Sequence, residues 1–195
     1  MHRFSFDAGN LALDLLNTRR GVGGQAQDEI SSPAALREWL TAAGLMTEEH
    51  LRRLRSSPPD SRVLLAEAQR LRVEIRQAVH AMKNARPAPE TSLMALNRVL
   101  ESRGTTLRLV RTQEGVALVE TSQEGPVYSV LSPVAQAGAH LIVDGDATRI
   151  RQCHADDCTC WFVDTSKNGR RKWCSMSRCG NRAKVAAHYR RHRED

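Results

Sequence analysis

The chain has 195 residues, and its 29 Lys and Arg against 22 Asp and Glu give a formal net charge of +7. A hydrophobic content of 41% excludes a wholly disordered chain, and the length allows one or two domains. No apolar stretch approaches the ~20 residues of a membrane span, and residues 1–7 lack the apolar core of a signal peptide, so we expect no membrane partner and no export.

The first part of the chain is predicted to be a helical body. Leucines at four positions between residues 10 and 18 indicate a short buried helix, and the polar, glycine-containing segment 19–31 is predicted to be a loop. Ser32 followed by a proline predicts the start of a helix that ends at Gly44. Thr47 is expected to cap another short helix.

The longest helix is expected to run from Asp60 or Ser61 to about Ala85, because apolar residues recur there every three, four or seven positions. The elements predicted after it are a helix over residues 91–102, a β-hairpin over 106–111 and 116–121, and a helical segment over 127–143 with a kink at Pro133. The fold class is therefore mainly α, with a small β-hairpin in the N-terminal domain.

The chemistry of the chain changes near residue 148. Residues 1–148 carry 17 basic and 17 acidic side chains, whereas residues 149–195 carry 12 basic and 5 acidic ones and all five cysteines. We therefore predict two domains, residues 1–147 and residues 148–195. The charge asymmetry between them indicates a polyanionic partner.

The cysteines of the second domain have the spacing of a structural zinc site, Cys153-x4-Cys158-x15-Cys174-x4-Cys179. Two close pairs can present four thiolates, which saturate one tetrahedral Zn²⁺ and leave no open position for a substrate. The zinc also explains how so small a segment could fold. Cys160 and His154 are alternative ligands within the first pair. The expected absence of export predicts a reducing cytoplasm, where clustered cysteines indicate metal binding or redox chemistry and not structural disulfides.

The run Cys179-Gly180-Asn181-Arg182 resembles the sequence that names CGNR-type zinc fingers, and the similarity extends over residues 153–191. Residues 13–18 and 36–45 resemble the ABATE domain of stress-induced transcription regulators. Cys160 departs from the finger pattern, in which glycine or another residue is usual. The resemblance implies a bacterial zinc-containing regulator of the stress response that binds DNA.

Basic side chains around the cysteines are the candidate DNA contacts. Ser175 or Ser177 is expected to cap a basic helix that runs to about Arg193, and the segment 166–172 adds a cationic loop. The candidates are Lys167, Arg170, Arg171, Lys172, Arg178, Arg182 and Lys184. Because four thiolates and one Zn²⁺ sum to −2, Arg182 could instead donate hydrogen bonds to sulfur.

These features bear on three classes of function. A DNA-binding regulator would act as a homodimer that reads two half-sites, whereas a protein-interaction module would use zinc only to hold its fold. The saturated zinc site and the lack of a catalytic motif predict that the chain is not an enzyme. Asp14, Asn17 and Thr18 are candidates to line a pocket for a small-molecule effector, with helix capping and a buried hydrogen bond as the alternative.

Overall fold

The computed structural model describes residues 4–22, 25–102, 105–112, 115–122 and 126–191. Its α-helices are α1 (Leu11–Asn17), α2 (Pro33–Ala42), α3 (Glu48–Ser56), α4 (Pro58–Lys83), α5 (Glu90–Glu101), α6 (Ser132–Val143) and α7 (Asn181–Arg191). Its antiparallel strand pairs are β1 (Arg19–Val22) with β2 (Gln25–Asp28), β3 (Thr105–Thr112) with β4 (Gly115–Ser122), and β5 (Ile150–Gln152) with β6 (Trp161–Val163). The prediction of a mainly α fold with a small β-hairpin is confirmed.

Side-chain caps start several helices where the sequence places them. The side-chain oxygen of Asn10 accepts a hydrogen bond from the backbone N–H of Ala12 at 2.9 Å. The hydroxyls of Ser32 and Thr47 each accept the N–H three residues on at 3.2 Å. These oxygens satisfy donors that the first turn of a helix leaves without a partner, so the helix starts can be read from the local sequence.

The longest helix, α4, begins at Pro58, earlier than predicted. Ser57 is its cap and accepts the N–H of Asp60 at 3.4 Å. The two prolines occupy the first turn, where a missing N–H costs no hydrogen bond, so they start this helix as well as ending α3. The helix ends at Lys83, and Ala85 then adopts a left-handed conformation with φ of 51°.

The predicted loop over residues 19–31 is wrong for most of its length, because β1 and β2 pair there as a hairpin from Arg19↔Asp28 to Val22↔Gln25. Charged side chains hold this hairpin, and alternating apolar residues do not. Arg20 pairs with Glu29 at 2.6 Å, and the buried Arg72 of α4 makes two 2.7 Å hydrogen bonds to Asp28. A search for apolar alternation cannot detect a strand that is fixed in this way.

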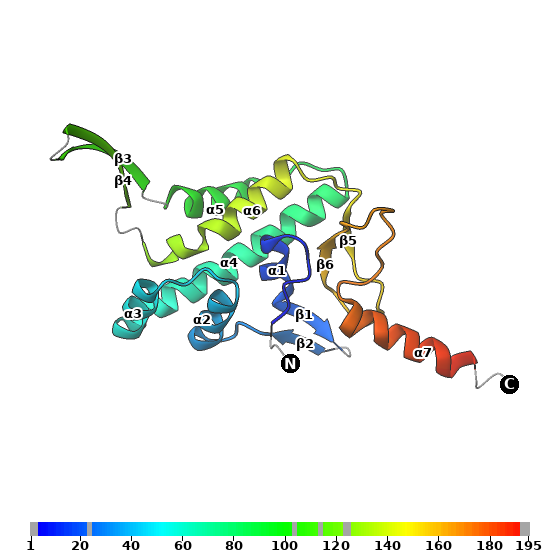
Figure 1. Cartoon of the computed structure of the whole chain (residues 1–195). Coiled ribbons are helices and arrows are strands. Elements are labelled where there is room, and N and C mark those ends of the chain that lie inside the picture. The colour runs from blue at the N-terminus through cyan, green and yellow to red at the C-terminus, as the bar shows by residue number, and fades with distance from the viewer. Residues whose placement is uncertain (1–3, 23–24, 103–104, 113–114, 123–125, 192–195) are drawn as a thin grey trace.

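The second hairpin is confirmed, with β3 and β4 paired from Thr105↔Ser122 to Thr112↔Gly115. It extends away from the helices as an arm (Figure 1). The helical segment after it is divided into η1, a 3₁₀ turn over Val127–Leu131, and α6, which starts one residue before Pro133. The break therefore falls at the predicted kink.

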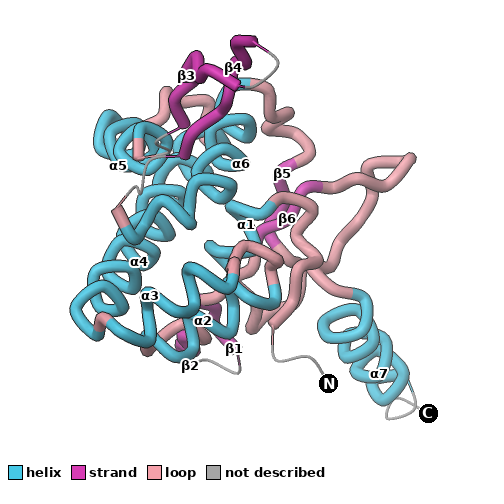
Figure 2. The backbone as a smooth tube through the Cα atoms, turned by 60° about the vertical axis from the view of Figure 1, so that its left-hand side comes forward, coloured by secondary structure: helices cyan, strands magenta, loops and turns pink. Residues whose placement is uncertain are grey.

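The core of the body forms around α4, which runs through the middle of the helices (Figure 1; Figure 2). Helices α1, α2, α3, α5 and α6 all pack against it. Leu13, Trp39 and Leu71 are at most 1% exposed within this core. Among the residues that the structure describes, no helix is both long and apolar enough to cross a membrane.

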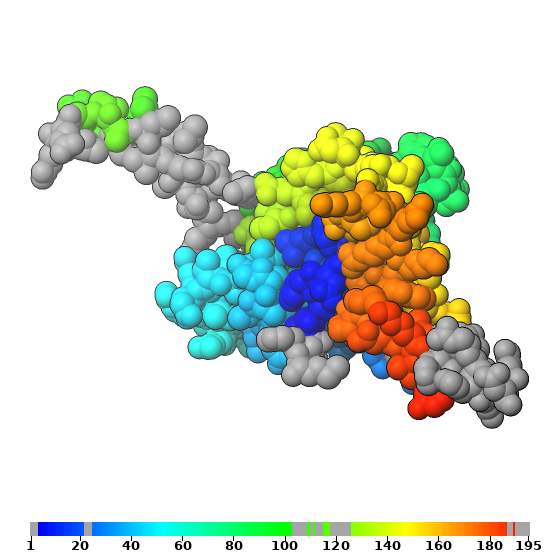
Figure 3. All heavy atoms as spheres, turned by 45° about the vertical axis from the view of Figure 1, so that its right-hand side comes forward, coloured from blue at the N-terminus to red at the C-terminus, as the bar shows by residue number. Residues whose placement is uncertain are grey.

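The C-terminal segment shares this core. Phe162 of β6 is fully buried and Trp161 is 5% exposed, in the same apolar cluster as α1 and α4. The Asn17 side chain donates to the Trp161 carbonyl at 2.7 Å and accepts the Trp161 N–H at 2.8 Å. The N–H of Val163 donates to the carbonyl of Ala8 at 2.8 Å. Figure 3 shows the N-terminal segment (blue) lying against the residues of the C-terminal segment (orange).

One apolar core thus spans the predicted boundary between residues 147 and 148. The division into two domains stays a prediction from the change in charge and cysteine content along the sequence. The apolar packing is continuous across the predicted boundary.

Candidate metal centre and basic surface

Four cysteine side chains converge in the C-terminal segment. Two belong to the turn between β5 and β6. Of the other two, Cys174 precedes η2, a π-helical turn over Met176–Gly180 that leads into α7, and Cys179 lies within that turn. The Sγ atoms of Cys153, Cys158, Cys174 and Cys179 all lie within 4.8 Å of one another. These are the four cysteines that the spacing pairs as ligands.

The arrangement fits one tetrahedral zinc ion. Zn–S bonds of about 2.3 Å place the sulfurs of a tetrahedron about 3.8 Å apart. The Sγ atoms of Cys158 and Cys174 are 3.8 Å apart, and those of Cys174 and Cys179 are 3.7 Å apart. Zinc would tie the two turns together, and a site with four thiolates serves structure because it leaves no position for a substrate.

The alternative ligands lie outside this set. His154 is exposed, and its ring stands edge-on to Trp173 with centroids 6.3 Å apart. Cys160 is buried and its backbone carbonyl accepts the N–H of Cys153 at 2.9 Å, which closes the first turn.

Gly180 lies at a crowded point of the second turn. A Cβ on Gly180 would collide with the sulfur of Met176 and approach the Trp173 ring to 3.1 Å. The glycine of the Cys179-Gly180-Asn181-Arg182 run therefore leaves room for the side chains of Met176 and Trp173, which a larger residue would have to displace.

Arg182 lies beside the sulfur cluster, as the charge argument suggested. Its Nη2 is 4.0 Å from the Cys179 Sγ and 2.6 Å from a carboxylate oxygen of Asp157. A guanidinium here offsets the net negative charge of a zinc–thiolate cluster, and its ion pair joins the two ligand turns.

Arg171 is engaged inside the protein. Its guanidinium lies over the Phe162 ring at 4.4 Å and donates to the backbone carbonyls of Trp173, Cys174 and Asp7. These contacts use the N–H donors of the planar guanidinium. Because the carbonyl acceptors belong to both the finger and the N-terminal segment, the Arg171 side chain connects the two.

The basic loop between the ligand pairs is organised by a carboxylate that the sequence analysis did not single out. Asp164 is 1% exposed and accepts the N–H groups of Ser166 and Arg171 at 3.0 and 2.9 Å. Hydrogen bonds from Ser166 hold the pKa of the Asp164 carboxyl below its usual range. The Asp-Thr-Ser run could have indicated this turn, because aspartate commonly bonds the backbone two residues on.

The remaining predicted cations differ in exposure. Arg178 is half-buried and lines a small cavity with Cys174. The side chains exposed to solvent are Lys167, Arg170 and Lys172 on the loop and Lys184 on α7. Arg182 on α7 is exposed as well, but it makes the contacts described above, whereas these four do not.

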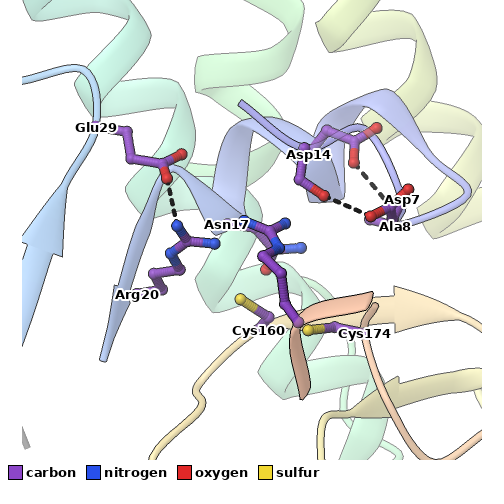
Figure 4. A pocket seen from close by; sticks show the side chains of 10 residues that line it. Asp7, Ala8, Asp14, Asn17, Arg20, Glu29, Cys160 and Cys174 are labelled. Carbon is purple, nitrogen blue, oxygen red and sulfur yellow. Dashed lines mark hydrogen bonds and ion pairs between the residues drawn. The ribbon is translucent and has the colours of Figure 1, made fainter. Parts of the chain in front are cut away.

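Two of the three predicted effector residues lie at the same cavity (Figure 4). Asp14 and Asn17 line it, but its volume is about 10 Å³, which is room for about one water molecule. The Asp14 carboxylate accepts the Ala8 N–H at 3.0 Å, and burial raises the pKa of this carboxyl to about 6. Thr18 does not line the cavity; its hydroxyl donates to the Leu15 carbonyl at 2.6 Å.

Two family models match the chain. The ABATE model, described as "Putative stress-induced transcription regulator", matches residues 9–145, and the CGNR zinc finger model matches residues 149–192. The first covers more than half of the chain, and the order of the two agrees with the resemblance found in the sequence. Both descriptions are of non-enzymatic kinds of protein. A comparison with curated proteins finds no match.

Proposed function

We propose, for a chain that belongs to the ABATE family and ends in a CGNR zinc finger, that it regulates transcription by binding DNA through this finger. The observation that carries the proposal is the set of exposed cations on the loop between the ligand pairs and on α7. Lysine and arginine bind the phosphates of DNA without regard to sequence and release its counterions.

The loop and the helix have different expected roles. Lys167, Arg170 and Lys172 would contact the phosphate backbone and position the finger. Helix α7 extends clear of the body (Figure 1; Figure 2), so it could enter the major groove with Lys184. Arg171 and Arg182 would support the finger through their contacts to other parts of it, and the half-buried Arg178 lines the small cavity.

One short helix gives limited affinity, so we propose a homodimer that reads two half-sites. Zinc-bound thiolates persist where cysteines stay reduced, which favours the cytoplasm as the place of action. Sensing of a small-molecule effector by the N-terminal domain remains part of the proposal. The assignment of Asp14, Asn17 and Thr18 to an effector pocket stays a prediction, and the small cavity beside them weakens it.

The test is a fluorescence polarisation titration of zinc-loaded protein with mixed genomic DNA fragments at low salt. Replacing Lys167, Arg170 and Lys172 together by glutamine should weaken binding at least about tenfold and reduce the salt slope by about 2–3. The matched control replaces three exposed arginines of α3 and α4 by glutamine: Arg52, Arg62 and Arg70. Absence of wild-type binding, or equal loss in both triple variants, would refute the proposal.

A protein-interaction module with a purely structural zinc is the second candidate. It is favoured by exposed apolar side chains on η2 and α7, since Met176, Val185 and Tyr189 are 49%, 54% and 65% exposed. This candidate predicts no appreciable DNA affinity at low salt, so the same titration separates the two.

A further inference from the structure

A cavity large enough for a small molecule lies on the body at the end of α4. Its volume is about 430 Å³, within the range of about 300–1,000 Å³ that ligand pockets occupy. Its lining residues are Gln77, His80 and Ala81 of α4 and Arg86, Pro87 and Pro89 of the segment that leads into α5. The cavity beside the zinc ligands, at about 10 Å³, has no such capacity.

A strained turn builds one wall of this cavity. Ala85 has φ of 51°, a left-handed conformation that costs a residue with a Cβ about 1 kcal/mol. The turn is closed by hydrogen bonds from the Ala85 N–H to the Met82 carbonyl at 3.1 Å and from the Arg86 N–H to the Ala81 carbonyl at 2.9 Å. It brings Pro87 and Pro89 back beside the last turns of α4. The two prolines restrict the backbone of this wall, so the cavity exists before any ligand arrives.

The chemistry of the lining selects one class of ligand. Ala81 and the two prolines offer an apolar surface against which a ring can pack. Arg86 is exposed at the cavity and takes part in none of the ion pairs that the structure records among the described residues. An unpaired guanidinium binds a carboxylate through two parallel hydrogen bonds.

His80 connects the cavity to the zinc finger. This residue lines the cavity, and its ring stands edge-on to the ring of Trp161, with centroids 5.2 Å apart and planes at 81°. Trp161 is held by the side chain of Asn17 and is the neighbour of Cys160 in the first ligand turn. One turn further along α4, Lys83 donates to the Ala147 carbonyl at 2.9 Å, just before β5. A ligand that moves His80 would therefore act directly on the contact between the body and the finger.

We propose that this cavity is an effector site for a small aromatic carboxylate, with the ring against Ala81 and the prolines and the carboxylate on Arg86. The site would alter how the finger is held through His80 and Trp161. The inference concerns ligand binding by the body and does not depend on DNA binding.

The experiment is isothermal titration calorimetry on full-length, zinc-loaded protein without DNA, with 2-naphthoate as the probe and 2-naphthamide as its uncharged counterpart. We expect saturable binding of one naphthoate per chain and binding of the amide at least about tenfold weaker, because the amide lacks the charge that Arg86 recognises. Arg86→Gln should weaken naphthoate binding about tenfold and leave the amide unchanged. The matched control, Arg62→Gln, changes an exposed arginine elsewhere on α4.

The link to the finger has its own readout. Naphthoate should shift the indole N–H signal of Trp161 in an NMR spectrum more than those of Trp39 and Trp173. The proposal is overturned by absence of saturable naphthoate binding up to about 1 mM, the weak end of the affinities considered for small ligands. It is overturned equally if Arg86→Gln and Arg62→Gln bind alike, or if the Trp161 signal does not move. None of these outcomes bears on whether the finger binds DNA.

Discussion

Replacing Asn17 by alanine should weaken the hold of the helical body on the zinc finger. Its side chain makes two short hydrogen bonds, 2.7 and 2.8 Å, to the carbonyl and N–H of Trp161. A hydrogen bond of this kind contributes about 1 kcal/mol net, and a buried group left without a partner costs about 1–3 kcal/mol. Because Trp161 is 5% exposed, water has little access to the freed groups. We expect the free energy of unfolding to fall by about 2–4 kcal/mol.

The assay combines urea unfolding followed by circular dichroism with zinc release followed by a chromogenic chelator. In Asn17→Ala both transitions should move to lower urea, because the same residue couples the helices to the first ligand turn. The matched control is Asn97→Ala, since Asn97 is exposed on α5. A change in the free energy of unfolding smaller than about 0.5 kcal/mol, which is usual for a surface substitution, would refute the interpretation that Asn17 stabilises the contact between the body and the finger. So would a change in unfolding with no change in zinc release.

Three further substitutions test local features. Asp14→Asn should remove a pH dependence of the free energy of unfolding. Because the pKa of Asp14 is raised to about 6 in the folded protein, its protonated form stabilises the fold below pH 4, and this stabilisation is lost as the pH rises through 6. The variant should gain up to about 3 kcal/mol at pH 7, measured by urea unfolding from pH 4 to 8; a wild-type slope retained in the variant would contradict this. Ala85→Gly should raise the free energy of unfolding by about 1 kcal/mol by relieving its positive φ, and a lower melting temperature would count against the strained turn. Asp28→Asn should cost about 3 kcal/mol, because Arg72 is 3% exposed and would lose its charge partner; denaturation indistinguishable from wild type would disprove this.

The sequence predicts best what short-range chemistry determines. Two helices can be predicted to begin after Ser32 and Thr47, because in each case one hydroxyl accepts a hydrogen bond from the N–H three residues further on. The four cysteines can be paired from spacing alone, because a tetrahedral ion accepts few arrangements of two ligand turns.

Contacts between distant parts of the chain could not be predicted. Asn17 and Trp161 are 144 positions apart, and no periodicity relates an amide on a short helix to the backbone of a distant strand. Arg171 has the same formal charge as its neighbours in the sequence. Only its contacts in the folded protein distinguish it, as a residue that supports the fold, from the exposed cations beside it. The first hairpin was missed for a related reason, since Asp28 at the end of β2 is fixed by Arg72 of the distant helix α4.

The hydrogen bond between Ala8 and Val163 bears on the order in which the chain can acquire its structure during synthesis. The N-terminal segment leaves the ribosome first, yet the strand against which it lies is translated near the end. Until β6 is made, Ala8 and the side of α1 that contacts β6 in the folded protein have no partner. Non-local contacts of this kind form late and slowly. A nascent or truncated chain that stops before Trp161 would present this apolar surface to chaperones and proteases.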